Sequence, residues 1–176
     1  AQFRRQRQMC IRDSNYTDVI NNNEHLDNDS WHLDLPDSII LDIKNSIAKP
    51  GELPYFQLTP IRKPTLKTKF DQLRNSGVVM MIGTDSGIPM KFHSQSTWNE
   101  LEVWVNVFNV EPLDAIKSAT YWPSFFMGVS DKVGTISVGK QADIIAVKGN
   151  VLKHISTLQN VDIVMKKGKI YKNTKS

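Results

Sequence analysis

Apolar positions recur with helical spacing over most of this 176-residue chain and with the spacing of short strands in its last quarter. The pattern predicts helices over residues 36–51, 65–76, 97–109 and 112–120. The third helix is expected to begin with a capping box of Thr97 and Glu100 and to bury an aromatic stripe. A brief strand is expected at 53–60, and four more at 134–138, 142–147, 161–166 and 169–171, the last two forming a hairpin across Lys167-Gly168.

The run 78–82, Val-Val-Met-Met-Ile, has no polar interruption and is typical of a parallel strand buried on both faces. It is followed by Gly83-Thr84-Asp85-Ser86-Gly87, a composition that favours a sharp turn. Functional groups of α/β proteins gather at the carboxyl ends of parallel strands, which makes Asp85 a candidate catalytic acid. The alternative is that Asp85 only caps the next turn.

Composition and charge exclude several classes of protein. An apolar fraction of 40% and a charged fraction of 23% are those of a globular chain, and no run approaches the roughly 20 apolar residues of a membrane helix. The net charge of +4 divides into +3 for residues 1–14, −6 for 15–131 and +7 for 132–176. The C-terminal lysines have no interleaved arginine or aromatic residue, which favours a solvated face over a nucleic-acid partner. A single cysteine, Cys10, excludes an internal disulfide and fits a reducing compartment.

Residues 1–14 show neither helical nor strand periodicity and end in Arg-Gln-Arg-Gln-Met-Cys-Ile-Arg-Asp-Ser. This stretch resembles translated adapter sequence of the kind found in some metagenomic assemblies, so we expect a non-native leader; a genuine basic arm is the alternative. His25 and His32 follow in a polar segment, seven residues apart, and are expected to be solvent-exposed.

From about residue 66 to 170 the chain resembles the C-terminal portion of a metal-dependent amidohydrolase of the imidazolonepropionase-like and prolidase-like groups. The resemblance rests on motifs that occur in the family's order. They are Gly83-Thr84-Asp85-Ser86-Gly87, His93, Glu100-Leu101-Glu102, Glu111-Pro112-Leu113-Asp114-Ala115-Ile116, Ala119-Thr120, Val133-Gly134-Thr135-Ile136, the run 139–147 and the run 161–169.

The resemblance implies an α/β fold, with residues 15–128 as the C-terminal fragment of a (β/α)₈ TIM-type barrel. Residues 129–176 would then be part of a small composite β-sandwich module. It makes 78–82 the eighth barrel strand and Asp85 both a metal ligand and the acid-base catalyst. A bound metal lowers the pKa of its water, and a nearby carboxylate can take the proton as the water attacks a C–N carbonyl. His93 would bind substrate, although an ordinary loop histidine is equally compatible with the sequence, and Asp143 is expected to cap a turn.

The chain departs from the family pattern in its histidines, because it has only four and no His-x-His. We therefore expect a truncated hydrolase of C–N bonds whose zinc or other divalent metal, and whose activity, belong to the complete protein, with no tight metal binding by this chain alone. The expected partner is a small amide, cyclic amide or dipeptide-like substrate, with homo-oligomerisation open and no nucleic acid or membrane involved. The alternative is a non-catalytic α/β module that binds a ligand at the Gly83–Gly87 loop.

Overall fold

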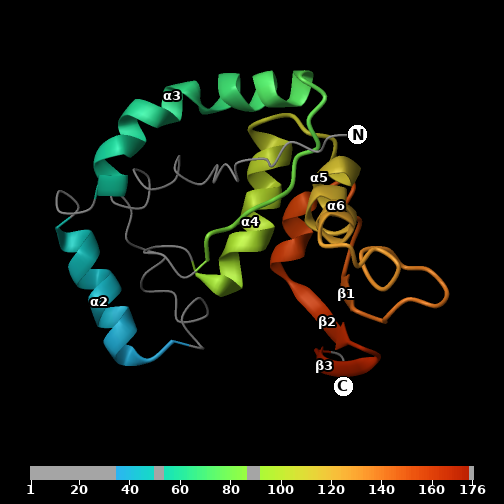
Figure 1. The fold of residues 1–176 in the computed structure, drawn as a ribbon. Coiled ribbons are helices and arrows are strands. Elements are labelled where there is room, and N and C mark those ends of the chain that lie inside the picture. The colour runs from blue at the N-terminus through green and yellow to red at the C-terminus, as the bar shows by residue number, and fades with distance from the viewer. Residues whose placement is uncertain (1–34, 50–53, 87–91, 175–176) are drawn as a thin grey trace.

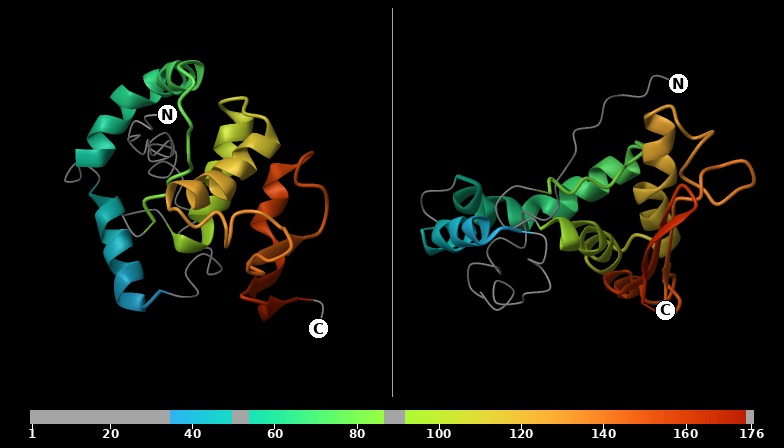
Figure 2. Two further views of the ribbon diagram at one scale, coloured as in Figure 1. Left: turned by 45° about the vertical axis from the view of Figure 1, so that its right-hand side comes forward. Right: turned by 90° about the horizontal axis from the view of Figure 1, so that it is seen from below.

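The computed structural model describes residues 35–49, 54–86 and 92–174 (Figure 1). Helix α4 lies between α2 and α3 on one side and a small sheet on the other, an arrangement that the further views in Figure 2 also show. The helices are α2 (Asp37–Ala48), α3 (Pro54–Asn75), α4 (His93–Asn106), α5 (Pro112–Ala119) and α6 (Tyr121–Phe126). The sheet contains β1 (Ile144–Val147), β2 (Val161–Lys166) and β3 (Lys169–Asn173), with the 3-10 helix η5 (Ile155–Gln159) between the first two. None of the helices in these ranges is long and apolar enough to cross a membrane.

The core is an aromatic cluster where α3 meets α4. The Phe70 ring stacks on Phe108 with ring centroids 4.5 Å apart and meets Trp104 edge to face at 5.1 Å. All three side chains are buried, together with Leu66 of α3 and Leu101 of α4. The expected apolar faces of these two helices are therefore confirmed as core packing.

Helix α3 begins earlier than the sequence pattern predicts. The strand expected at 53–60 is wrong, because the helix runs without a break from Pro54 to Asn75 and contains Pro60 and Pro64. Proline removes an intrahelical hydrogen bond and bends a helix, and Figure 1 shows α3 curved along its length. The helix ends close to the limit predicted by the pattern at residue 76, and Gly77, two residues beyond Asn75, has a φ of +72°, which is typical of a helix C-terminus.

The α/β character of the chain is confirmed, but the part described contains no barrel: its strands form one antiparallel sheet of order β1-β2-β3. The hairpin across Lys167-Gly168 is confirmed, with φ values of +50° and +78° at the two turn residues. Such values at both positions belong to the type I′ turn that suits hairpin twist. The strand expected at 134–138 is wrong, since these residues form turns without ladder partners.

The run 78–82 is extended, but it is not paired as a strand with any described segment. The expectation of a strand in a parallel sheet is thus not met here, because a strand needs a neighbour to accept and donate its backbone hydrogen bonds. Ile82 N–H instead donates to the carbonyl of Ser118, near the end of α5, at 3.1 Å. The run passes alongside α4, with Met80 and Ile82 packed against the core (Figure 1).

Gly134 allows a close approach between the 131–140 turns and α6. Its φ is +95°, and a Cβ built there would lie 2.1 Å from Ser124 Oγ and 3.1 Å from the Thr120 carbonyl oxygen. Gly139 has a similar φ of +87° but nothing within 4 Å of a built Cβ. The two glycines therefore separate backbone strain from steric overlap.

We predict that Gly134→Ala lowers the free energy of unfolding by about 2–4 kcal/mol, because it adds overpacking to a left-handed backbone. Gly139→Ala, the matched control, should cost only about 1–2 kcal/mol from backbone strain. Urea unfolding of the two variants measures both values. Equal losses would show that Ser124 yields to the added methyl group.

Candidate functional site

Asp85 lies just beyond the extended run, three residues after the backbone bond from Ile82 to Ser118. Its side chain is exposed, whereas Gly83 before it is buried. The Ser86 hydroxyl donates to Thr84 Oγ1 at 2.9 Å across Asp85. The turn therefore presents a solvent-accessible carboxylate on a segment that is anchored to the core.

The backbone of Asp85 is left-handed, with a φ of +44°. Aspartate and asparagine enter this region more readily than other non-glycine residues, because their short polar side chains bond locally. Such conformations cluster at functional sites, and they also occur in ordinary turns. The geometry is thus compatible with both interpretations of Asp85 that the sequence leaves open.

His93 is the first residue of α4, so the expectation that it lies in a loop is wrong in this respect. Its side chain is exposed, and residues 87–91, which separate it from Asp85, lie outside the described ranges. Phe92 takes the N-cap position, and no side chain caps the helix. The expected capping box of Thr97 and Glu100 is therefore wrong.

Sequence reasoning missed the buried polar side chains of α4. Glu100 is 0% exposed, and Ser96, also 0% exposed, donates from its hydroxyl to the Phe92 carbonyl at 2.7 Å. The signal was present in the spacing, because Glu100 lies four residues before Trp104 on the buried face. A carboxylate held on a core-facing stripe is incompatible with the exposed capping role.

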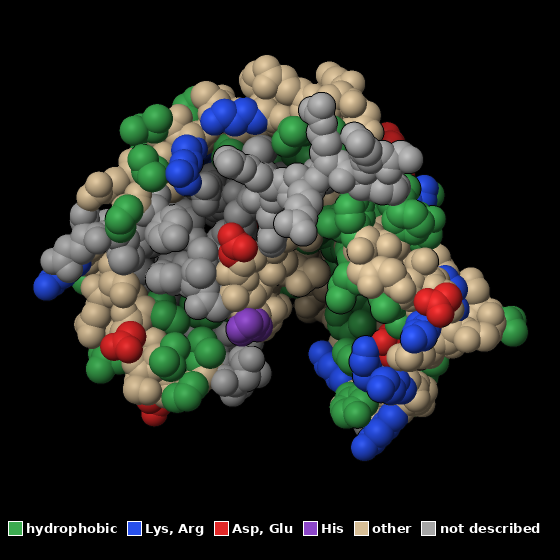
Figure 3. Space-filling model, in the orientation of Figure 1, with side chains coloured by type: hydrophobic (Ala, Val, Ile, Leu, Met, Phe, Trp, Pro, Cys, Tyr) green, Lys and Arg blue, Asp and Glu red, His purple; other side chains and the backbone are tan. Residues whose placement is uncertain are grey.

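Asp143 has the structural role expected of it. Its Oδ1 accepts the backbone N–H of Lys167 at 2.8 Å, and its Oδ2 forms an ion pair with Lys166 Nζ. The Lys166 ammonium and the Lys167 N–H lower the pKa of Asp143 below its ordinary value of 3.8. The carboxylate therefore ties the residue before β1 to the β2–β3 turn, in a part of the chain whose basic side chains, blue in Figure 3, are all lysines.

A metal ion would need more ligands than the described residues bring together. Among them, no three His, Cys, Asp or Glu side chains are placed to hold a metal ion. Asp85 could contribute one ligand, whereas a catalytic zinc takes three from the protein. The side chains described here thus do not form a metal centre by themselves.

Comparison with known proteins assigns the chain to a family. The model of the amidohydrolase family matches residues 9–171, which is nearly the whole sequence. The chain belongs to the amidohydrolase family. Members of this family are typically metal-dependent, although the described residues of this chain do not form a metal site.

Individual relatives match over part of their length. Imidazolonepropionase of Shewanella oneidensis is 36% identical over 81 residues, which are 46% of this chain and 20% of that protein. Imidazolonepropionase of Shewanella baltica is 35% identical over the same length. The chain thus spans about a fifth of the curated relatives that it matches.

Solved structures give the same picture. A Xaa-Pro dipeptidase with methionine in its active site superposes with a TM-score of 0.59 and 34% identity, over 68% of this chain and 28% of that chain. Aspergillus niger ochratoxinase superposes with a TM-score of 0.57 and 25% identity, over 75% of this chain and 30% of its own. The mixed α/β arrangement described here therefore corresponds to about 30% of an amidohydrolase structure.

We predict that Asp143→Asn destabilises the chain at neutral pH through the hairpin. A folded-state pKa below 3.8 means that the carboxylate stabilises the fold above that pH and ceases to do so as the pH falls through the lowered value. The difference in unfolding free energy between wild type and variant should therefore be constant near neutrality and shrink below about pH 4. Denaturant titrations across pH 2–7 measure it.

The control for this prediction is Asp162→Asn, because Asp162 lies in the same sheet and accepts from the Thr174 hydroxyl at 3.0 Å instead of pairing with a lysine. The ionic role of Asp143 would be contradicted if the difference in unfolding free energy between wild type and Asp143→Asn stayed unchanged down to pH 2.

Proposed function

We propose that the protein is a metal-dependent hydrolase of carbon–nitrogen bonds and that residues 15–128 and 129–176 are, respectively, the C-terminal part of its barrel and part of its accessory β module. Membership of the amidohydrolase family supports the reaction class. The relatives named imidazolonepropionase and Xaa-Pro dipeptidase favour a cyclic amide or a dipeptide-like substrate. Because the chain spans only 20–28% of these proteins, the activity requires residues beyond those described.

Asp85 is the acid-base residue of this proposal. The observation that carries it is an exposed carboxylate in a left-handed turn at the end of the anchored run, within the family's Gly-Thr-Asp sequence. As a water molecule attacks the carbonyl carbon, Asp85 accepts the proton that the water loses. When the C–N bond breaks, the same proton passes to the leaving nitrogen, which returns Asp85 to its ionised state. Asp85 would also be one ligand of the metal, and the other ligands would come from residues of the complete protein beyond those described.

His93 is the substrate-binding residue of the proposal. It is exposed at the beginning of α4, and this helix follows the Asp85 turn in the chain. From there an imidazole can donate to an oxygen of a bound amide or accept from its N–H, depending on its tautomer. Its contribution would be to hold the substrate and not to move the proton.

We predict that Asp85→Asn in the complete protein lowers kcat at least about a thousandfold, because the loss of a general base typically costs 10²–10⁴ in rate and charge at the site is also lost. Asparagine tolerates a positive φ, so the thermal midpoint should change little. Steady-state kinetics and thermal unfolding measure the two effects. Asp131→Asn, at an exposed turn, is the control.

Asparagine also caps turns about as well as aspartate. If the Asp85→Asn variant kept activity within tenfold of wild type, Asp85 would have only the structural role of a turn cap. If the complete protein is also inactive on amides but binds a ligand that is lost in a variant of the Gly83–Gly87 loop, the non-catalytic binding module is the correct function.

For His93 we predict that His93→Gln raises KM about tenfold with kcat nearly unchanged, because it removes binding shared by ground state and transition state. His154→Gln, an exposed histidine before η5, is the control. An equal fall in kcat and kcat/KM would instead place His93 in the chemical step.

A further inference from the structure

The extended run 78–82 leaves most of its backbone hydrogen-bonding groups unused. Ile82 N–H donates to the Ser118 carbonyl at 3.1 Å, but no described residue bonds to the backbone N–H or C=O groups of residues 78–81. These residues are half-buried, and buried backbone groups are normally paired. A strand with unpaired donors and acceptors is a template for pairing with another extended chain. The run is therefore an open strand edge.

The hydrogen bond from Ile82 shows which side of the run is open. In a strand, the N–H and C=O of one residue point to the same side, and those of the next residue point to the other side. Because the Ile82 N–H points to α5, the backbone groups of Met80 share that side. The N–H and C=O groups of Val79 and Met81 therefore point away from α5, and these two residues form the open edge.

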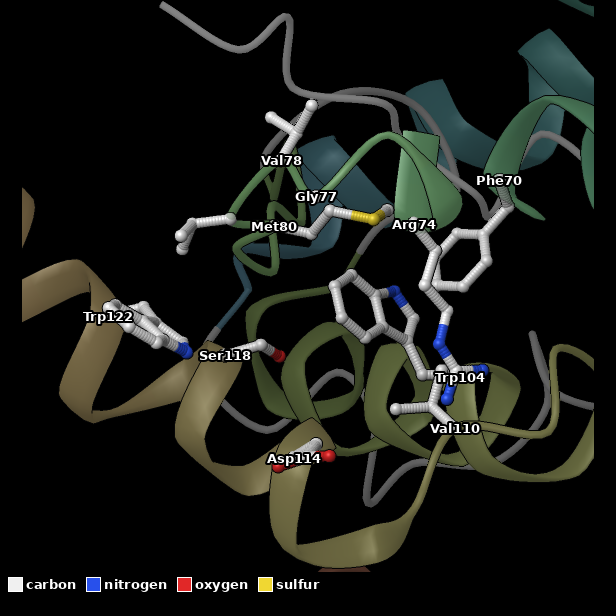
Figure 4. A pocket seen from close by; sticks show the side chains of 11 residues that line it. Phe70, Arg74, Gly77, Val78, Met80, Trp104, Val110, Asp114, Ser118 and Trp122 are labelled. Atoms are coloured by element: carbon white, nitrogen blue, oxygen red, sulfur yellow. The ribbon is translucent and has the colours of Figure 1, made fainter. Parts of the chain in front are cut away.

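The side chains of the run divide in the same way. Met80 and Ile82 pack against the core cluster, and Figure 4 shows Met80 at a cavity of about 280 Å³ that the run lines together with α3 and α4. Successive side chains of a strand point to opposite faces, so Val79 and Met81 lie on the face away from this core. A second strand at the open edge would cover both of them.

The sequence of the run favours pairing with another apolar strand. It reads Val-Val-Met-Met-Ile and contains no charge. The outer strand β3 also has an open edge, but it carries Lys169 and Lys172, and lysines on an edge discourage association. A second copy of the chain brings an identical apolar edge with the same unpaired groups, so a single contact satisfies the backbone of both chains.

Two-fold symmetry fits such a contact, because identical strands pair antiparallel about a two-fold axis and most dimers have this symmetry. With the axis beside Met80, Val79 of each copy lies opposite Met81 of the other. Each of these pairs exchanges both of its N–H···O bonds, since their backbone groups face the open side. All the unpaired groups of Val79 and Met81 are satisfied in this register.

We propose that the chain forms a two-fold dimer in which the 78–82 runs of two copies pair as antiparallel strands. The proposal rests on the open edge and not on the hydrolysis proposed above. In the complete barrel proposed there, a neighbouring strand would occupy the same edge, so the dimer concerns the 176-residue chain. Small interfaces form weak complexes, and we expect a dissociation constant between about 1 µM and 1 mM.

The first test uses the unmodified chain. Sedimentation equilibrium measures dimerisation, and amide hydrogen exchange followed by NMR locates the contact. Above the dissociation constant the Val79 and Met81 amides should exchange at least about tenfold more slowly than below it, because the dimer bonds their N–H groups. The Met80 amide, which faces α5, is the internal control and should change less than about twofold. A chain that stays monomeric up to about 1 mM, or a dimer without this protection, overturns the proposal.

The second test sets the register with charge pairs. Val79→Lys/Met81→Lys places like charges opposite each other across the two-fold axis, whereas Val79→Glu/Met81→Lys places opposite charges there. The first variant should dimerise at least about tenfold more weakly than the second, because each cross-strand pair occurs twice. Circular dichroism checks that both variants fold, and if either does not, the exchange measurement on the unmodified chain decides.

Ile136→Lys/Val138→Lys is the matched control, since it makes the same change of charge at two apolar residues of an exposed turn. It should dimerise within about twofold of wild type, because it lies outside the run. Loss of the dimer in this control would place the interface at the 131–140 turns and overturn the proposal. Equal weakening in the two variants of the run would also overturn it, because parallel pairing sets each residue opposite itself.

Discussion

The packing of Phe70 against Trp104 and Phe108 is the constraint on which the described structure depends. It joins α3 to α4, two helices separated in the chain by the run that carries Asp85. Aromatic pairs of this kind contribute about 0.5–1.5 kcal/mol beyond the area they bury. Met80 and Ile82, in the run between the two helices, pack against this cluster, so the segment that leads to Asp85 is held beside the core.

The hydrogen bond from the Ile82 N–H to the Ser118 carbonyl satisfies two backbone groups that their own segments leave unpaired. An extended run without a paired strand has backbone donors to satisfy, and a helix leaves its last carbonyl groups without intrahelical partners. In the described part of the chain, each supplies what the other lacks at a distance of 3.1 Å. The end of helix α5 is thereby fixed beside the run.

The sequence predicted features that are local in origin. The Lys167-Gly168 hairpin and the Gly77 helix end each depend on a few neighbouring residues, and each is observed. The turn-capping role of Asp143 is also confirmed, although the turn that it caps lies 24 residues further along the chain. The failures share a different cause. Residues 78–82 have the composition of a strand, but strand pairing depends on a partner elsewhere in the chain. The strand expected at 53–60 is instead the first part of α3, which continues through Pro60 and Pro64 and is curved.

The same distinction between local and non-local information governs the candidate site. Asp85 could be found from its motif because a turn after an apolar run is encoded in ten consecutive residues. A metal centre could not be predicted in this way, because three or more ligands from distant parts of a chain must converge within bonding distance. The described residues place no such group together. Asp85 therefore remains a candidate, and a metal centre that included it would need further ligands from residues beyond those described.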